Sequence, residues 1–415
     1  MKRTRRTLNP AHVTVAILLL LAAFPARAGV KYKVLHNFGS GKDGATPYGP
    51  PAFYGEELYG VTISGGTGCN PPLCGTVFSL SPQPSGTWKE AIVYNFPGGD
   101  YSYPGDGLIF DSRGNLYGIM GGYKGGVYEL APRPAEWDFT PLYTGGAQGG
   151  LLMDQSGNLY GGMGPGQDHG GAIGELSPGS GGWDYTQLYS FCSGNSCPDG
   201  VDMPTAPIWD GKGNLFGTTT WGGVYKGFCR AYYGYDGCGV IYEMTPNGDG
   251  TWTYHVLHGF ASSKNDGQNP YGGLVMDKAG NFYGGTWTGG RYELGTLFKL
   301  TYAAGHWQET ILYDFTDCKQ GCGADGTLAL DKAGNLYGTA AGGTGSCDGL
   351  TCGVVFKLSP QKDGKWKYTV VYDFTDEGGG SAPFYGVILD DKGHLFGVTS
   401  KFGKYGFGTA FEITP

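Results

Sequence analysis

The chain has 415 residues, with 81 glycines, 30 tyrosines and 21 phenylalanines, and only 15% of its residues are charged. This mixture favours many short strands and tight turns, and its aromatic content excludes an intrinsically disordered chain. The formal net charge of −8 argues against a nucleic-acid partner, because an acidic surface repels phosphate groups.

The first predicted element is a secretory signal peptide over residues 1–28. Basic residues at the start are followed by an apolar run from Val13 to Phe24 and by Ala26-Arg27-Ala28, the order typical of such a leader. The run is shorter than the roughly 20 residues that a membrane-spanning helix requires. Removal of residues 1–28 takes away five basic residues and no acidic one, so the net charge changes from −8 to −13. We expect a secreted, periplasmic or cell-surface protein without a transmembrane span in the mature chain.

The remainder, residues 29–415, is organised by a repeated phrase, D-x-x-G-N-L-Y-G. Its copies begin at Asp111, Asp154, Asp210, Asp277, Asp331 and, with His394 in place of asparagine, Asp390, and a degenerate first copy lies at Tyr54–Gly60. Each copy belongs to a unit of four predicted strands: strand A ends at the aspartate, strand B contains L-Y-G, strand C resembles G-T-V-F-K-L, and strand D opens on tryptophan. The spacing between these tryptophans is 46 to 69 residues. Such units predict one domain, an all-β, seven-bladed β-propeller of four-stranded antiparallel blades.

The two ends of the repeat array predict how the ring closes. A D-type strand, Lys31 to Phe38, precedes the first A strand, whereas the chain stops directly after the last C strand, Gly408 to Thr414. The N-terminal strand can therefore complete the last blade and leave no exposed sheet edge. An open β-solenoid, the alternative, does not need this offset.

Most of the repeated residues have a structural interpretation. The aspartate of D-x-x-G-N can accept backbone N–H groups in a hairpin turn while the glycine takes positive φ, and the clustered acids that calcium requires are missing. The tryptophans that open D strands are expected to fill the wedges between blades; they are Trp88, Trp137, Trp183, Trp252, Trp307 and Trp366. His36 and His258 occupy a D-strand position that holds tyrosine in other repeats. No histidine pair has metal-ligand spacing, so we expect no metal and no cofactor.

Three segments carry a resemblance to a known family: Asp266-Gly267 with Pro270 and Gly272-Gly273-Leu274, Asn335-Leu336-Tyr337-Gly338-Thr339, and Gly353-Val354-Val355-Phe356-Lys357-Leu358. They are similar to the consensus of the GloVer-type tandem-repeat family of bacterial extracellular proteins. The resemblance covers nearly the whole mature chain and implies an exported or surface-associated repeat protein. It brings no catalytic residues and no established ligand.

The two faces of the predicted ring differ. The A–B and C–D turns are short and uniform, whereas the B–C and D–A connections vary in length and carry all ten cysteines; we call this side the loop face. In an exported chain these cysteines predict disulfides rather than a zinc site. The pairs are Cys69 with Cys74, Cys192 with Cys197, Cys229 with Cys238, Cys318 with Cys322, and Cys347 with Cys352. Variable loops on a rigid scaffold are where function usually resides.

A candidate ligand-binding patch lies on the loop face. Trp221 and Trp287 fall in B–C loops of adjacent blades, outside the repeated positions. Aromatic rings beside polar groups suit sugars, and the neighbouring candidates are Tyr225, Arg230, Tyr232, Tyr233, Tyr235 and Arg291. The alternative is that these aromatic side chains pack within a disulfide-tied loop.

The sequence favours a monomeric, non-catalytic binding or interaction propeller, with a polysaccharide or a surface protein as partner and a glycan or cell-wall polymer as the expected ligand. The alternative is a propeller enzyme that acts on carbohydrate, a glycosidase or a lyase. Such an enzyme needs two suitably spaced carboxylates. Loop-face acids are available at Asp168, Asp202, Asp236, Glu293, Asp317 and Asp348. A metal-centred hydrolase in the central channel has less support, since no ligand set is expected there that departs from the repeat pattern.

Overall fold

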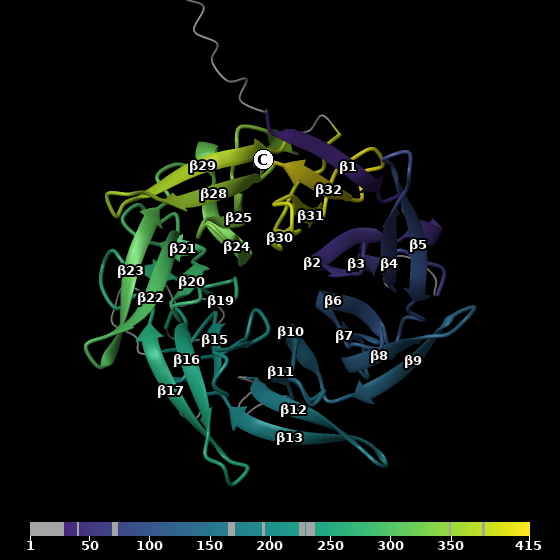
Figure 1. Ribbon diagram of the computed structural model, residues 1–415, viewed down its shortest axis with the longest axis horizontal. Coiled ribbons are helices and arrows are strands. Elements are labelled where there is room, and N and C mark those ends of the chain that lie inside the picture. The colour runs from purple at the N-terminus through teal and green to yellow at the C-terminus, as the bar shows by residue number, and fades with distance from the viewer. Residues whose placement is uncertain are drawn as a thin grey trace, which may run out of the picture.

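The computed structural model describes residues 29–39, 41–68, 74–164, 171–192, 196–223, 229, 237–347, 350–375 and 378–415. Its strands form seven four-stranded antiparallel sheets, which stand as blades around a central axis (Figure 1). The helical elements among these residues are short 3-10 turns, at Gly41–Asp43 and Cys318–Gln320. No helix among the described residues is long and apolar enough to cross a bilayer. The predicted seven-bladed propeller is confirmed.

Each of the first three blades runs outward in chain order. Blade 1 consists of β2 (Ala45–Tyr54), β3 (Glu57–Ser64), β4 (Thr76–Pro82) and β5 (Trp88–Asn95). Blade 2 consists of β6 (Ser102–Phe110), β7 (Leu116–Gly121), β8 (Gly126–Pro132) and β9 (Trp137–Tyr143). Blade 3 consists of β10 (Ala147–Met153), β11 (Leu159–Met163), β12 (Ala172–Gly179) and β13 (Gly182–Ser190).

The next three blades follow the same order but have shorter inner strands or additional small hairpins. Blade 4 consists of β14 (Ile208–Trp209), β15 (Leu215–Thr219), β16 (Val240–Pro246) and β17 (Trp252–Gly259). Blade 5 consists of β19 (Val275–Met276), β20 (Phe282–Gly285), β22 (Thr296–Ala303) and β23 (His306–Asp314), with β18 (Gly267–Gln268) and β21 (Thr288–Gly289) paired beside it. Blade 6 consists of β24 (Cys322–Leu330), β25 (Leu336–Ala341), β28 (Val354–Pro360) and β29 (Trp366–Asp373), with the small hairpin β26 (Ser346–Cys347) and β27 (Leu350–Thr351).

Blade 7 joins the two ends of the described chain. It consists of β30 (Ile388–Leu389), β31 (Leu395–Thr399), β32 (Thr409–Thr414) and, as its outermost strand, β1 (Lys31–Asn37). β1 pairs antiparallel with β32, from Lys31 opposite Thr414 to Asn37 opposite Thr409. In Figure 1 the purple β1 therefore lies beside the yellow β32. The predicted closure by the N-terminal strand is confirmed.

The repeated aspartates support the A–B turns, as the sequence predicts. In blade 5, Oδ1 of Asp277 accepts hydrogen bonds from the backbone N–H groups of Ala279 and Asn281, and Oδ2 accepts them from the Asn281 side chain and the Tyr283 hydroxyl. Gly280 takes a φ of +81°, a conformation that strains other residues. Partial burial alone would raise the pKa of Asp277, but these hydrogen bonds outweigh it and hold that pKa below its usual value.

Tryptophans of the D strands fill the wedges between blades. The ring of Trp307 in blade 5 lies 5.8 Å, between centroids, from Phe216 of blade 4, and 5.5 Å from Phe282 of its own blade. The other five tryptophans also contact an aromatic ring on the B strand of the preceding blade: Trp88 with Phe396, Trp137 with Tyr59, Trp183 with Tyr117, Trp252 with Tyr160, and Trp366 with Tyr283. Their predicted role in the core is confirmed.

Candidate functional site

The inner strands of all seven blades line an axial cavity of about 850 Å³. Each A strand runs from the loop face toward an A–B turn, so the order of residues along it gives their depth. The later residues that line the cavity are aliphatic: Ile109, Leu152, Ile208, Leu330 and Leu389. The earlier ones include carboxyl, amide and phenol groups. The cavity is therefore apolar near the A–B turns and polar toward the loop face.

Three aspartates from three different blades line the polar part of the cavity: Asp106 on β6, Asp202 just before β14, and Asp325 on β24. Burial, with a smaller contribution from the nearby Asp202, raises the pKa of Asp106 to about 6 against the opposing effect of a hydrogen bond from the Gly149 backbone. Burial also raises the pKa of Asp202, opposed by a hydrogen bond with Thr220. The cavity thus holds carboxyl groups whose charged forms are penalised by their surroundings.

Of the three aspartates, Asp325 has the surroundings that disfavour its ionised form most strongly. The residue is 7% exposed, and its Oδ2 atom is buried without a hydrogen-bond partner within the described part of the chain. Burial raises its pKa well above the usual value. A buried polar atom without a partner costs free energy, so this carboxyl is suited to a ligand that offers a hydrogen bond.

Two packed tyrosines lie within the electrostatic influence of the three aspartates. The rings of Tyr48 on β2 and Tyr385 pack with their centroids 4.5 Å apart. Burial raises the pKa of Tyr48, and the charges of Asp106 and Asp202 act in the same direction. Burial raises the pKa of Tyr385 as well, with smaller contributions from Tyr48, Asp106 and Asp325. All three carboxyl groups therefore act electrostatically on this tyrosine pair.

The rim of the cavity carries exposed aromatic rings. Tyr271 lines the cavity and is 39% exposed, and Trp287, in the B–C connection of the same blade, is 36% exposed. Their ring centroids are 5.8 Å apart. Further exposed aromatic residues of the loop face are Tyr103, Tyr123, Tyr292, Phe384, Tyr405 and Phe407. Trp287, a candidate from the sequence, thus contacts a tyrosine that lines the axial cavity.

The other sequence candidates are distributed differently. The guanidinium group of Arg291 lies 5.6 Å from the centre of the exposed Tyr292 ring. Trp221 is only 8% exposed and packs in a cluster with Val201 and the Cys192–Cys197 disulfide, which is the packing role given above as the alternative. The remaining candidates lie outside the described residues: Tyr225, Arg230, Tyr232, Tyr233 and Tyr235.

Four predicted disulfides are present, all in B–C or D–A connections: Cys192–Cys197, Cys229–Cys238, Cys318–Cys322 and Cys347–Cys352. Cys74 is also disulfide-bonded, while Cys69 lies outside the described residues. The disulfides therefore stabilise the loop face, on which the cavity opens.

Of the proposed acids that fall within the described residues, Asp202 lines the cavity and the other two do not. Glu293 is exposed in the B–C connection of blade 5, and Asp317 caps the 3-10 turn at Cys318–Gln320. Asp168, Asp236 and Asp348 lie outside the described residues.

Asp106 and Asp325 are not among the residues predicted from the sequence, although the repeat contains a signal for both. In the phrase D-G-x-x-P-x-G-G-L, Asp106 stands where blade 5 has Gly272, and Asp325 stands where it has Tyr271. Both residues depart from the repeat pattern at positions that line the channel. The departures occur at inward-facing positions, where only the closed ring brings them together.

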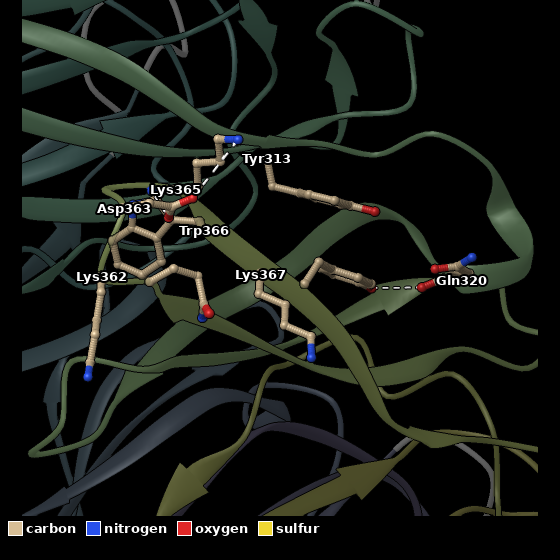
Figure 2. A pocket seen from close by; sticks show the side chains of 9 residues that line it. Tyr313, Gln320, Lys362, Asp363, Lys365, Trp366 and Lys367 are labelled. Carbon is tan, nitrogen blue, oxygen red and sulfur yellow. Dashed lines mark hydrogen bonds and ion pairs between the residues drawn. The ribbon is translucent and has the colours of Figure 1, made fainter.

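A second hollow, of about 840 Å³, lies on the outer edge of blades 5 and 6 (Figure 2). Its lysines, Lys362, Lys365 and Lys367, extend in different directions rather than toward one point. Its two tyrosines, Tyr313 and Tyr368, form a stacked pair with centroids 4.3 Å apart, and equivalent stacks occur between other blades. The lining is thus composed of solvated turn residues and repeated structural residues, unlike that of the axial cavity.

The chain resembles solved structures at low sequence identity. A polysaccharide lyase of the PL25 family, an ulvan lyase bound to -[GlcA(1-4)Rha3S]-, gives a TM-score of 0.53 at 11% identity, covering 91% of this chain and 94% of the lyase. A putative 6-phosphogluconolactonase from Bacteroides fragilis gives a TM-score of 0.48 at 14% identity, covering 88% of this chain and 100% of the other. At these identities the likeness concerns the fold alone.

No curated protein matches the chain in sequence. The family model described as the Gloeobacter/Verrucomicrobia repeat matches residues 204–415, which is half of the chain and includes the three segments that carry the resemblance noted from the sequence. The chain belongs to the Gloeobacter/Verrucomicrobia repeat family.

Proposed function

We propose that the chain is an exported, non-catalytic propeller that binds a saccharide of a glycan or cell-wall polymer at the mouth of the axial cavity. The observation that carries the proposal is the convergence of three carboxyl groups, two packed tyrosines and an exposed aromatic rim on one cavity. The disulfides of the loop face and the leader expected at residues 1–28 support export.

The chemistry of the lining suits sugars. The C–H faces of a sugar ring stack on aromatic rings such as Tyr271 and Trp287, while its hydroxyl groups require fixed hydrogen-bond partners. Oδ2 of Asp325 has no hydrogen-bond partner within the described part of the chain and is available to a ligand. A volume of about 850 Å³ lies within the usual range for small-ligand sites and is large enough for the end of an oligosaccharide.

The charge of the lining restricts the sugar class. The described residues that line the cavity include three aspartates and no lysine, arginine or histidine. When they are ionised, carboxyl groups in a low-dielectric site repel further negative charge, and an anionic ligand would find no cationic partner among these residues. We therefore infer a neutral or amino sugar as the ligand, in contrast to the -[GlcA(1-4)Rha3S]- saccharide bound to the ulvan lyase.

A binding screen tests the proposal. Neutral, amino-substituted and anionic polysaccharides are immobilised, and retention of the purified protein is followed by titration calorimetry with oligosaccharides of the retained polymer. Loss of one stacking ring in Tyr271→Ala or Trp287→Ala is expected to weaken binding by about tenfold. Tyr302→Ala removes an exposed tyrosine from the opposite face, at the C–D turn of blade 5, and should bind like the wild type. Unchanged affinity in both rim variants would contradict the proposed site.

A second candidate function, an enzyme that acts on carbohydrate, is favoured by one observation. Asp106 has a pKa of about 6, and Asp202 lies near enough to influence it, so one carboxyl could donate a proton while the other is ionised. Incubation of the retained polysaccharide with wild type and Asp106→Asn tests this function. New reducing ends or unsaturated products with the wild type alone would support catalysis, and an unaltered polymer would support binding only.

A further inference from the structure

Two clusters of the same composition lie between blades, away from the axial cavity. One contains His258 on β17, Asp266 in the following D–A connection, and Glu309 on β23 of the next blade. The other contains His36 on β1, Asp43, and Glu90 on β5. The first cluster joins blade 4 to blade 5, and the second joins blade 7 to blade 1. Each brings together one imidazole and two carboxyl groups from two D strands and the loop between them.

The distances within these clusters suit a metal ion. Nε2 of His258 lies 3.3 Å from Oδ2 of Asp266 and 3.8 Å from Oε2 of Glu309. Nε2 of His36 lies 2.9 Å from Oδ1 of Asp43, and in each cluster the three candidate ligand atoms lie within 4.8 Å of one another. Two ligand atoms that are each bound at about 2.0–2.2 Å to a tetrahedral zinc ion lie roughly 3.3–3.6 Å apart. Small side-chain adjustments would therefore place all three groups around one ion.

The carboxyl groups have hydrogen-bonding capacity that the described residues do not use. Asp266 is 4% exposed, yet its Oδ1 atom is buried without a hydrogen-bond partner, and the same holds for Oε1 of Glu309 and Oε1 of Glu90. Two neighbouring carboxyl groups removed from water repel each other and lose their hydration. A divalent cation would compensate both effects.

The backbone already orients one ligand in each cluster. Asp266 accepts a hydrogen bond of 2.7 Å from the N–H group of Ser262, and Asp43 accepts one of 2.7 Å from Gly39. Such outer contacts fix the direction of a ligating carboxylate. The same arrangement at two places in the ring indicates one local design used twice.

At the other five blade junctions of the ring, a stacked aromatic pair occupies the positions of the histidine and the glutamate. There a tyrosine of one D strand stacks on an aromatic ring of the next D strand: Tyr94 with Phe139, Tyr143 with Tyr185, Tyr189 with Tyr254, Tyr313 with Tyr368, and Tyr372 with Tyr32. His36 and His258 do stand at the tyrosine position, as the sequence predicts. Each, however, is accompanied by a glutamate at the position of the second ring, so the two positions change together. The sequence offers no histidine pair with metal-ligand spacing, and the structure adds carboxyl partners that lie on another strand and blade.

We propose that each cluster binds one divalent cation of borderline softness, zinc being the best match, through the histidine Nε2 atom and one oxygen from each carboxylate. Imidazole nitrogen and carboxylate oxygen both bind zinc, and a set of one nitrogen and two oxygens leaves the fourth tetrahedral position open for water. The ion would fasten adjacent blades and the loop between them. The inference does not depend on the proposed saccharide binding.

The junction pairs of the chain itself provide the test variants. His258→Tyr/Glu309→Tyr reproduces the Tyr313–Tyr368 type of stack at the first cluster, and His36→Tyr/Glu90→Phe reproduces the Tyr94–Phe139 type at the second. The protein is stripped with a chelator and dialysed, and zinc binding is measured by calorimetry and by metal analysis after gel filtration. Cobalt is substituted in parallel, because its absorption spectrum reports tetrahedral nitrogen and oxygen coordination.

We expect two zinc ions per wild-type chain, one per chain in either double variant, and none when both pairs are replaced, with near-ultraviolet circular dichroism unchanged. Zinc that does not bind to the stripped wild type, or a stoichiometry that the variants leave at two, would overturn the proposal. Saccharide retention by the quadruple variant is measured separately, so failure of the metal sites and failure of the saccharide site are distinguishable.

Discussion

Among individual residues, Asp106 lines the proposed binding site and at the same time lowers the stability of the folded protein near neutral pH. Its carboxyl group lines the axial cavity, and burial raises its pKa to about 6, whereas an aspartate of an unfolded chain titrates near pH 4. Between these two values the unfolded chain ionises first and becomes relatively more stable. The folded protein therefore loses stability as pH rises from about 4 to about 6.

Replacement of Asp106 by asparagine should remove this loss. We expect Asp106→Asn to match the wild type near pH 4 and to exceed it by up to about 3 kcal/mol in free energy of unfolding near pH 7. Urea denaturation followed by tryptophan fluorescence at several pH values measures the difference. Asp391→Asn, which removes a fully exposed carboxylate, is the control for loss of one negative charge. A constant difference across the pH range would contradict the assignment.

Asp277 should behave in the opposite sense, because its pKa is lowered in the folded state. Its ionised form supports the A–B turn of blade 5, so this stabilisation is present above the unfolded pKa and disappears as pH falls through the folded pKa. Asp277→Ala is expected to lower the free energy of unfolding by about 2 kcal/mol near neutral pH. The loss of unfolding free energy caused by Asp277→Ala should be smaller in acid. Denaturation curves at neutral and at acidic pH would measure the difference.

At the scale of elements, β1 contributes most through its position. It covers the outer edge of β32, and its neighbour Phe38 is fully buried against Phe78 of blade 1. Without β1, β32 would present unpaired backbone groups to solvent, and exposed edges of this kind associate with other chains.

Deletion of residues 31–38 from the mature chain should therefore lower the thermal midpoint markedly and produce dimers or aggregates in gel filtration. The control is a permuted chain in which the same residues follow Pro415 through a short turn. This permuted chain regains the missing strand as an ordinary D strand after β32, and we expect wild-type stability and a monomeric elution volume. Equal stability of the deleted chain and the wild type would mean that strand pairing at this edge contributes little.

At the scale of the whole molecule, the architecture could be predicted because it is repeated. The turn aspartates, wedge tryptophans and D strands recur in every unit or nearly so, and repetition distinguishes a structural pattern from chance. The cavity could not be predicted in the same way. Asp106, Asp325 and Tyr385 are single departures in three units far apart in the chain, and only the closed ring makes them neighbours.

The tryptophans outside the repeat illustrate a second limit of prediction from the sequence. Trp221 and Trp287 occupy comparable loops, but Trp221 packs on a disulfide while Trp287 lies exposed beside Tyr271. The difference depends on the loop before blade 4, whose Val201 pairs with Trp221 through backbone hydrogen bonds. Residue type and spacing carry no information on such a contact. The burial of Trp221 could therefore not be predicted from the sequence.

The ring of wedge tryptophans has one interruption. Aligned with the other D strands, β1 would place its tryptophan at residue 30, which is valine and 46% exposed. The B-strand ring at that junction, Tyr337 of blade 6, is approached by the Lys357 side chain of its own blade, whose amino group lies 5.2 Å from the ring centre. Within the described part of the ring, the interface between blades 6 and 7 is thus the one that lacks a wedge tryptophan. We therefore expect a ring under mechanical load or heat to part first at this interface and to open into an arc that begins with blade 7.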